Sequence, residues 1–279
     1  MQQLPPLAQV IARFQISTKK SLGQHFLLDS GVTDTIVRYA GSLADCNIIE
    51  VGPGPGGLTR SLLKAGTKKL FVIEKDERCL AALAQIKDIV GNRLEILHGD
   101  ALEADLVELV PAPRRIVANL PYNAGTMMLL NWLDAVYAQA GAFESMTLMF
   151  QKEVAQRIVA EPGGKDFGRL SVLSQWLCEC RLDMELPPEA FTPPPQVSSA
   201  VVTLTPRAKP LVDVRKDVLE IVVAKAFNQR RKMLRSALKG LSVPPGALLD
   251  AAGIDGTLRA EQLDVATLCR LALAYHNLR

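Results

Sequence analysis

The chain has 279 residues, of which 48% are hydrophobic and 22% are charged, a composition that excludes wholesale disorder, collagen-like repeats and coiled coils. This length suits one large α/β domain, or a domain of about 200 residues with a small second one. Lys and Arg exceed Asp and Glu by 32 to 29, a net charge of +3, so any polyanionic partner must be inferred from where the charges lie.

The sequence gives no sign of a metal centre, a disulfide framework or a membrane anchor. Its five cysteines have no repeated spacing, and its three histidines lie in unrelated contexts. The first residues lack a basic segment followed by an apolar core, and no apolar run approaches the ~20 residues that span a bilayer. We therefore expect a soluble cytoplasmic protein of a reducing compartment, with no metal and no membrane contact.

Near the N-terminus, residues 19–28 combine two lysines with side chains that favour burial. Gln24 and His25 are polar residues within this stretch. We interpret the segment as a lid over a cofactor, with Lys19 and Lys20 facing a polyanion. The competing interpretation is a buried N-terminal staple with a structural histidine.

Between residues 47 and 151, short apolar runs alternate with longer segments of helical periodicity, such as 58–65 and 78–89. The predicted strands are residues 47–51, 69–74, 93–97, 115–118 and 145–150. This alternation is typical of βαβ units, and it predicts a mostly parallel sheet with helices on both faces.

The pattern changes after residue 177. Residues 177–186 and 197–204 are predicted strands joined by a proline-rich loop, which leaves no room for a crossover helix, so we expect an antiparallel pair at the sheet edge. Beyond Pro206 the chain reads as helical, with predicted helices at residues 218–238, 248–252 and 261–274. We place a domain boundary there, between residues 1–206 and 207–279.

The first predicted strand leads into a glycine-rich turn, residues 52–57 (GPGPGG), where the backbone of Gly52 and its neighbours is open to a ligand. Glu74 ends the second predicted strand, where a carboxylate can accept hydrogen bonds from both hydroxyls of a ribose. Together these features fit any adenosine cofactor, namely NAD, FAD or S-adenosylmethionine. A glycine turn with a solvated glutamate is the alternative.

Two further observations favour S-adenosylmethionine. Asp100 follows the third predicted strand and can accept the exocyclic amine of adenine at the same sheet edge. The glycine run also lacks the second half of a typical pyrophosphate cradle, and S-adenosylmethionine holds no phosphate.

Asn119-Leu120-Pro121-Tyr122 follows the fourth predicted strand, at the edge where open α/β sheets bind ligands. The motif suits methylation of the exocyclic amine of adenine, because the Asn119 side-chain oxygen and the Leu120 carbonyl would accept its two N–H hydrogens. Pro121 would stiffen the turn, and Tyr122 would stack on an extruded base. The competing interpretation is a strand-ending turn with a surface tyrosine.

A run of basic residues without interleaved acids lies in the C-terminal part of the chain. Its members are Lys225, Arg230, Arg231, Lys232, Arg235 and Lys239. A solvated helix face normally alternates the sign of its charges, so the run suggests contacts with phosphates. A solubilising helix surface is the alternative.

Taken together, these motifs resemble the ribosomal-RNA adenine dimethyltransferase family over nearly the whole chain. The similar blocks are residues 21–29 (SLGQHFLLD), 50–59 (EVGPGPGGLT), 72–76 (VIEKD), 99–101 (GDA), 119–122 (NLPY), 191–202 (FTPPPQVSSAVV) and 226–238 (AFNQRRKMLRSAL). The last two blocks and the helical tail are more similar to the small-subunit branch than to the antibiotic-resistance methylases. The resemblance implies a Rossmann-like class I methyltransferase fold, with an antiparallel edge hairpin and a small all-helical C-terminal domain.

The resemblance also implies roles for individual residues. S-adenosylmethionine would be bound by His25, Leu27, Gly52, Glu74, Asp100 and Asn119. The implied substrate is a pair of adjacent adenosines in a hairpin loop near the 3′ end of 16S rRNA, in an immature 30S subunit. Each adenosine would be dimethylated on N(6). We expect the enzyme to be monomeric when free. The family more often has Asn at the position of His25.

The resemblance further suggests that Phe191 stacks on the target base, whereas a core residue that anchors the proline-rich loop is the competing interpretation. We expect Arg230, Arg231 and Lys232 to contact the RNA.

Three other functions remain as alternatives. A DNA adenine methyltransferase uses a similar strand-end motif, but it usually carries a larger recognition domain than this helical tail. A non-catalytic assembly factor would use methylation only as a release step. An NAD dehydrogenase is disfavoured, because no proton donor of the kind that such enzymes use stands at the predicted sheet edge.

Overall fold

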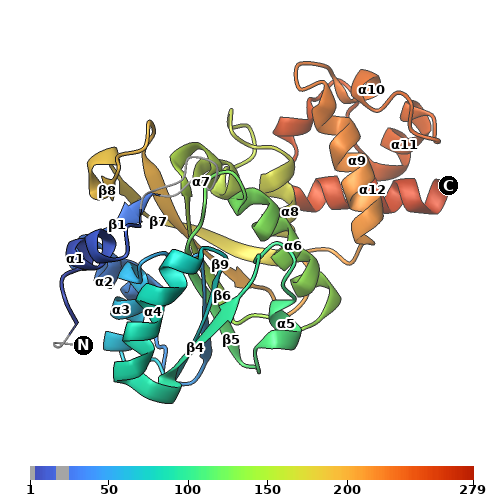
Figure 1. Ribbon diagram of the computed structural model, residues 1–279. Coiled ribbons are helices and arrows are strands. Elements are labelled where there is room, and N and C mark those ends of the chain that lie inside the picture. The colour runs from blue at the N-terminus through green and yellow to red at the C-terminus, as the bar shows by residue number, and fades with distance from the viewer. Residues whose placement is uncertain (1–3, 17–24) are drawn as a thin grey trace. The chain divides into compact units, whose positions relative to one another are not determined.

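The computed structural model describes residues 4–16 and 25–279, and its chain forms two compact units (Figure 1). The first, which we call the sheet unit, comprises residues 1–155 and 181–206. The second, the helical unit, comprises residues 156–180 and 207–279. The sequence-based division at residue 206 therefore assigned residues 156–180 to the wrong unit.

The physical reason for that misassignment is the packing of helix α8 (Arg169–Leu177). Trp176 on this helix is completely buried, and its indole N–H donates a 2.8 Å hydrogen bond to the carbonyl of Val212. The backbone N–H of Leu211 in turn donates to the carbonyl of Trp176 at 2.8 Å. These contacts connect α8 to the C-terminal segment, although local sequence gives no sign of them.

The sheet unit is built on a seven-stranded sheet with the order β4-β3-β2-β5-β6-β9-β7. The strands are β2 (Asn47–Val51), β3 (Lys69–Glu74), β4 (Leu94–His98), β5 (Arg114–Asn119), β6 (Ser145–Gln151), β7 (Cys178–Leu186) and β9 (Ser199–Pro206). The first five pair in parallel, and β9 runs antiparallel to β6. The predicted α/β fold, mostly parallel with an antiparallel edge, is confirmed.

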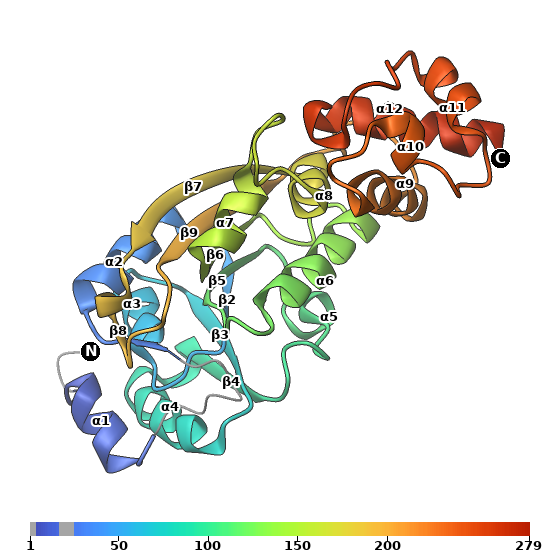
Figure 2. The same ribbon diagram turned by 90° about the horizontal axis from the view of Figure 1, so that it is seen from above.

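Helices cover both faces of this sheet (Figure 2). One face carries α2 (Ser30–Tyr39), α3 (Gly57–Lys64) and α4 (Glu77–Val90), and the other carries α5 (Leu106–Leu109) and α6 (Gly125–Ala138). Because β2 has β3 on one side and β5 on the other, the strand order reverses there, which is where open α/β sheets bind ligands.

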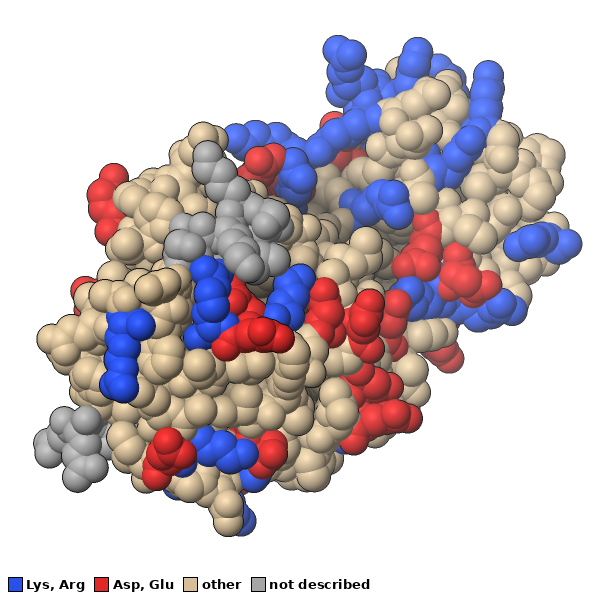
Figure 3. Space-filling view, viewed as in Figure 1, with Lys and Arg blue, Asp and Glu red and all other residues tan. Residues whose placement is uncertain are grey.

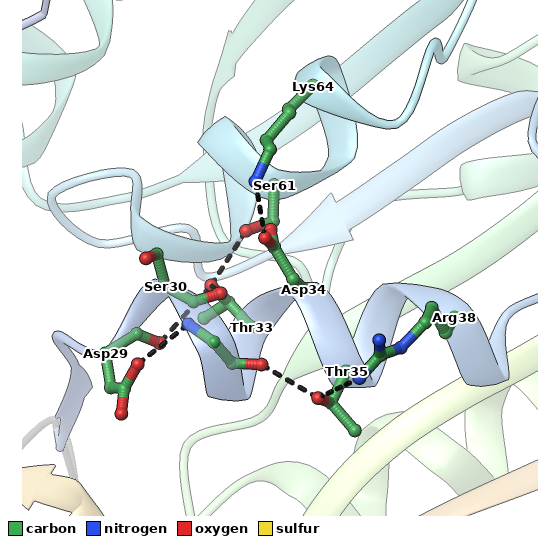
Figure 4. A network of polar contacts seen from close by, with 9 residues as sticks. Asp29, Ser30, Thr33, Asp34, Thr35, Arg38, Ser61 and Lys64 are labelled. Atoms are coloured by element: carbon green, nitrogen blue, oxygen red, sulfur yellow. Dashed lines mark hydrogen bonds and ion pairs between the residues drawn. The ribbon is translucent and has the colours of Figure 1, made fainter.

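Helices α2 and α3 are joined by polar contacts (Figure 4). The hydroxyls of Thr33 and Ser61 form a buried hydrogen bond of 2.8 Å, and Lys64 Nζ lies 2.6 Å from a carboxylate oxygen of Asp34. Asp29 caps the start of α2 by accepting a hydrogen bond from the N–H of Gly31. These contacts hold α2, the helix that follows the segment interpreted above as a lid, against α3.

A separate two-stranded ladder pairs β1 (Phe26–Leu27) with β8 (Phe191–Thr192), antiparallel. The proline-rich segment after β7, predicted as an irregular loop, thus contains β8 and the 3₁₀ turn η3 (Pro188–Ala190). A further short helix, α1 (Leu7–Arg13), precedes this ladder, and its Val10 packs with Phe26 and Cys79. Neither two-residue strand has a local signal that sequence reasoning could detect.

The helical unit contains α8, the last part of α7 (Lys152–Val159), and the C-terminal elements. These are α9 (Lys216–Asn228), α10 (Leu234–Ala237), α11 (Pro245–Ala252), the 3₁₀ turn η4 (Ala260–Gln262) and α12 (Val265–Leu278). The prediction of one continuous helix over residues 218–238 is wrong. Backbone N–H groups of Leu234 and Arg235 donate to the carbonyls of Leu258 and Gly256, so tertiary hydrogen bonds replace those that would continue the helix.

Within the part of the chain that the structure describes, no helix combines the length and the apolar composition that a membrane crossing requires. In those same residues, no group of three or more His, Cys, Asp or Glu side chains is arranged to hold a metal ion.

Gly57, the first residue of α3, provides a test of how closely the β1 segment packs on the glycine turn. A Cβ at Gly57 would lie 2.7 Å from the carbonyl oxygen of Leu27, whereas a Cβ at Gly246, in the first turn of α11, would meet nothing within 4 Å. We expect Gly57→Ala to lower the free energy of unfolding by ~1–3 kcal/mol. Gly246→Ala should raise it by ~0.4–1 kcal/mol. Urea unfolding followed by circular dichroism measures both, and equal stability of the two variants would contradict the packing.

Candidate active site

A pocket lies at the carboxyl ends of the parallel strands, at the strand reversal. Its lining comprises residues 25–27, 50–55, 57–58, 73–75, 99–102 and 119–124, together with Met128. All the residues predicted for the cofactor and for catalysis lie in this lining, namely His25, Leu27, Gly52, Glu74, Asp100, Asn119, Leu120, Pro121 and Tyr122. The structure therefore brings together side chains from five separate stretches of the chain.

The glycine turn forms one wall of the pocket through backbone conformations that favour glycine. Gly52, Gly54 and Gly56 have φ values of +65°, +55° and +92°. A Cβ at Gly54 would lie 3.0 Å from the ring of Phe26, so the turn also needs glycine to let the β1 segment approach. Gly52 is exposed and lines the pocket with Gly54, so backbone without a side chain borders the space where we expect the ligand.

The carboxylate of Glu74 holds this turn against the end of β3. Its Oε2 accepts a 3.0 Å hydrogen bond from the N–H of Gly54, and its Oε1 accepts bonds of 2.9 Å from the N–H groups of Lys75 and Asp76. Burial raises the pKa of Glu74, which is 5% exposed, while the backbone donors oppose this shift. A carboxylate has about four lone-pair sites, so three donors leave capacity for a ribose hydroxyl. Sequence reasoning predicted the ribose contact but missed the loop contact.

Asp100 is fixed on the adjacent wall. Its Oδ1 accepts a 3.0 Å hydrogen bond from the N–H of Leu102, and its Oδ2 lies 3.1 Å from Lys75 Nζ. The Leu102 hydrogen bond and the Lys75 ammonium lower the pKa of Asp100. The side chain is therefore an ionised acceptor at neutral pH.

Asn119 is oriented by the β1 segment. Its Nδ2 donates a 3.2 Å hydrogen bond to the carbonyl of His25, and the Nδ1 of the His25 ring donates to the carbonyl of Pro193 at 2.9 Å. Because a carbonyl can only accept, the nitrogen of the carboxamide must face His25, which directs its oxygen the other way. The expected lid, where the structure describes it, thus positions the Asn119 side chain as well as lining the pocket. The first part of this segment, residues 19–24 with Lys19, Lys20 and Gln24, lies outside the described residues.

Tyr122 is held at both ends of its side chain. Its hydroxyl forms a 2.5 Å hydrogen bond with the hydroxyl of Ser199, which is completely buried on β9, and burial raises the pKa of the phenol. Its ring lies against the ring of His25, with 5.2 Å between centroids and an interplanar angle of 31°. Sequence reasoning did not single out Ser199, because no local pattern indicates that a residue 77 positions away meets Tyr122.

Two expectations about substrate residues change with the structure. Phe191 is 2% exposed and packs in the apolar core with Leu27 and Leu58, outside the pocket lining, so the structure supports its interpretation as a core anchor rather than as a stacking surface. Arg230 donates hydrogen bonds to the carbonyls of Gly164 (3.2 Å) and Phe167 (2.9 Å), and thereby holds a loop of its own unit.

Arg230 also lies 3.4 Å from Glu261. Its guanidinium is therefore engaged inside the helical unit, whereas Arg231 and Lys232 are exposed. The sequence pattern could not separate an arginine that anchors a loop from its two exposed neighbours.

The charges of the pocket fit a cationic cofactor. Among the described residues, three carboxylates, those of Glu50, Glu74 and Asp100, line it together with one lysine, Lys75. This lining suits the positive charges of S-adenosylmethionine, and it would repel the pyrophosphate of a dinucleotide. The glycine turn supplies the close backbone approach that an adenosine needs.

The sheet order, the pocket at the strand reversal, the glycine turn and the acidic strand ends define a class I, S-adenosylmethionine-dependent methyltransferase. A family model described as ribosomal RNA adenine dimethylase matches residues 15–277. The chain belongs to this family.

Relatives and solved structures agree with that assignment. The chain is 55% identical to the ribosomal RNA small subunit methyltransferase A of Ruegeria pomeroyi, over 96% of each chain. It is 56% identical to the protein of the same name from Paracoccus denitrificans, over 96% of this chain and 95% of that one. A crystal structure of the 23S rRNA methyltransferase ErmE has a TM-score of 0.67 at 26% identity, covering 90% of this chain and 99% of that one. A dimethyladenosine transferase from Plasmodium falciparum shares the fold, with a TM-score of 0.78 at 24% identity over 91% and 98% of the two chains.

The Tyr122–Ser199 bond can be measured by a double-mutant cycle. Tyr122→Phe and Ser199→Ala should each lower the free energy of unfolding by ~1–3 kcal/mol, because each leaves the other hydroxyl without this partner. The double variant should lose less than the sum, by roughly 1 kcal/mol. Strictly additive losses in urea unfolding would show that the two hydroxyls do not interact.

Proposed function

We propose that this methyltransferase transfers methyl groups to N(6) of two adjacent adenosines in a hairpin loop near the 3′ end of 16S rRNA. Each adenosine becomes dimethylated during assembly of the small ribosomal subunit. The small-subunit methyltransferases that share more than half of its residues support this target. The observation that carries the chemistry is the orientation of Asn119, whose carboxamide nitrogen is occupied by the carbonyl of His25.

The lining residues suit distinct parts of the cofactor. In this proposal Glu74 binds the ribose and Asp100 the adenine, while Gly52 offers backbone in the turn after β2, on the other side of Glu74 from Asp100. His25 and Leu27 close the pocket from the β1 segment, which we propose to act as the lid. S-adenosylmethionine, when bound, supplies an electrophilic methyl group on a sulfonium sulfur.

The strand-end motif activates the target amine without a catalytic base. The Asn119 side-chain oxygen and the Leu120 carbonyl accept its two N–H hydrogens, which draws the nitrogen lone pair out of conjugation and toward the methyl group. Pro121 contributes no competing N–H, and its carbonyl accepts from Ala124 and Gly125, so the start of α6 holds the turn. The ring of Tyr122 offers a stacking face for the extruded base.

The second transfer imposes a constraint on this site. After the first methylation only one N–H remains on the amine, so the contacts with Asn119 and Leu120 cannot both persist. A methyl group must then occupy the place of one hydrogen bond. The reaction still needs no base, because the methylated product loses its proton readily. The transfer itself depends on holding the amine nitrogen in line with the bond from sulfur to the methyl group.

The helical unit is the proposed contact with rRNA in the immature 30S subunit. It holds sixteen Lys and Arg against ten Asp and Glu, a net charge of +6, whereas the sheet unit holds sixteen against nineteen, a net charge of −3. Figure 3 shows Lys and Arg side chains gathered over the C-terminal helices, at the upper right. Cations grouped in this way favour phosphates. We also propose that the protein works as a monomer in the cytoplasm.

Replacing Asn119 tests the chemical step. Asn119→Ala should lower kcat by roughly 10²- to 10³-fold, the usual loss when one stabilising polar contact is removed from a reacting group. Binding of 30S subunits should stay within twofold of wild type. The matched control is Asn47→Ala. Asn47 also donates to a carbonyl, that of Pro111, but it is the first residue of β2 and so lies at the end of that strand away from the pocket. Methyl transfer to immature 30S subunits is measured, and full activity of Asn119→Ala would refute the mechanism.

A second experiment tests the RNA contact. Arg231→Ala combined with Lys232→Ala should weaken 30S binding and reduce the slope of log affinity against log salt by ~1.4–1.8, one phosphate contact per lost cation. Arg270→Ala, which removes an exposed arginine of the same unit on α12, should leave the slope unchanged. Arg230 is kept, because it holds the loop at Gly164 and Phe167. If the double variant kept the salt dependence of wild type, Arg231 and Lys232 would not contact RNA phosphates.

A further inference from the structure

Glu50 is a carboxylate that the structure buries in the wall of the pocket. It lies near the carboxyl end of β2, is 1% exposed, and lines the pocket with Glu74. Its Oε2 accepts a 2.6 Å hydrogen bond from the hydroxyl of Thr59, which is itself completely buried on α3. The backbone of Thr59 also favours the ionised form of Glu50. Among the described residues the carboxylate is thus partnered by the neutral groups of Thr59, where a structural ion pair would have a guanidinium or an ammonium group.

The other charged groups around the pocket do not compensate Glu50. Glu74, at the end of the neighbouring strand β3, presents a second carboxylate to it. Lys75, the lysine of the described lining, lies 3.1 Å from Asp100 and is paired there. Two other polar side chains line the same pocket: the ring of His25, from the β1 segment, and the uncharged carboxamide of Asn119, at the end of β5. The described chain therefore places a second anion, and no cation, against the Glu50 carboxylate.

An ionised carboxylate without an opposite charge is costly inside a protein, and such groups usually become neutral instead. Burial raises the pKa of Glu50 to about 8, and the charge of Glu74 acts in the same direction, while the Thr59 hydrogen bond opposes the shift. Burial also raises the pKa of Glu74, but its backbone N–H donors favour the ionised form. With a pKa of about 8, Glu50 is therefore mostly protonated at neutral pH in the protein without cofactor, whereas the three backbone N–H donors make Glu74 the better place for a negative charge.

We propose that Glu50 gives up its proton to solvent when the cofactor binds, because its carboxylate then faces a positive group of the cofactor. This inference rests on the cofactor pocket assigned above. S-adenosylmethionine carries a sulfonium and an α-ammonium group, and either one supplies the positive charge that Glu50 lacks. In this step the O–H bond of the carboxylic acid breaks, the electron pair stays on the carboxylate, and the proton passes to the buffer.

The pH dependence that follows has a definite sign. Below the pKa of Glu50 in the protein without cofactor, binding has to expel a proton, so the apparent affinity for S-adenosylmethionine should rise by up to about tenfold per pH unit as the pH increases. Above a pH of about 8 the affinity should level off. Asp100 does not titrate in this range, because the Leu102 N–H and Lys75 lower its pKa.

Isothermal titration calorimetry of the whole chain tests the proposal directly. S-adenosylmethionine is titrated at pH 7 in phosphate and in Tris, whose ionisation enthalpies differ, so the difference in observed heat counts the protons exchanged. Wild type should release about one proton per cofactor bound. The isosteric variant Glu50→Gln should release close to none, and its affinity should lose the pH dependence.

Two control variants separate Glu50 from other titrating groups. Glu108→Gln changes an exposed glutamate on α5 and should leave the proton release at about one. His25→Asn removes the imidazole ring from the pocket lining, and the release should persist. A titration with S-adenosylhomocysteine then identifies the charge: release that persists assigns the ammonium group, and release that disappears assigns the sulfonium.

The outcomes distinguish this inference from the proposed function. Binding of S-adenosylmethionine without proton release, or equal release by Glu50→Gln, would overturn the role of Glu50 and leave the pocket assignment intact. A wild-type chain that does not bind the cofactor would overturn the pocket assignment itself. If Glu50→Gln does not fold, infrared difference spectra of wild type decide, since binding should replace the band of a protonated carboxylic acid with carboxylate bands.

Discussion

The hydrogen bond from the Gly54 amide to the Glu74 carboxylate is the contact on which the pocket depends. It ties the turn after β2 to the end of β3, and the same carboxylate accepts the N–H groups of Lys75 and Asp76. A side chain that serves as a ligand acceptor thus also shapes the backbone around the ligand. The left-handed glycines follow from this arrangement, since only they let the turn reach the carboxylate and still leave room for Phe26.

The second organising constraint is electrostatic. The fold concentrates carboxylates at the carboxyl ends of its strands, although burying like charges together is unfavourable. Hydrogen bonds from the backbone amides of several residues stabilise Glu74 and Asp100, while Glu50 is stabilised by Thr59 alone among the described residues. The resulting excess of acidic groups suits a cationic cofactor. The helical unit has the opposite charge balance, with an excess of Lys and Arg over Asp and Glu.

Sequence reasoning located the strands and the pocket because these depend on local signals. Strands β2 and β3 were predicted with the observed bounds, since both are continuous apolar runs that end at turn residues or at a carboxylate. The positions of Glu74, Asp100 and Asn119 then followed from the rule that parallel strands end at one edge. Motifs placed at strand ends are therefore the most predictable part of this site.

The remaining errors came from tertiary contacts that no local pattern records. The helix expected over residues 218–238 breaks because Leu234 and Arg235 bond to the loop at Gly256 and Leu258. Phe191 and Arg230 have residue types common at RNA surfaces, but one fills the core and the other holds a loop. Ser199 could be found only by knowing that β9 passes beside Tyr122.

The short ladder between β1 and β8 has a consequence for entry to the pocket. Within the described residues it joins two residue pairs, Phe26 with Thr192 and Leu27 with Phe191, whereas β5 and β6 of the main sheet pair over five residues. Parting this ladder breaks few hydrogen bonds and leaves the seven-stranded sheet intact. The cost of such an opening is therefore set by the burial of Phe26, Leu27 and Phe191 in the apolar core more than by backbone pairing.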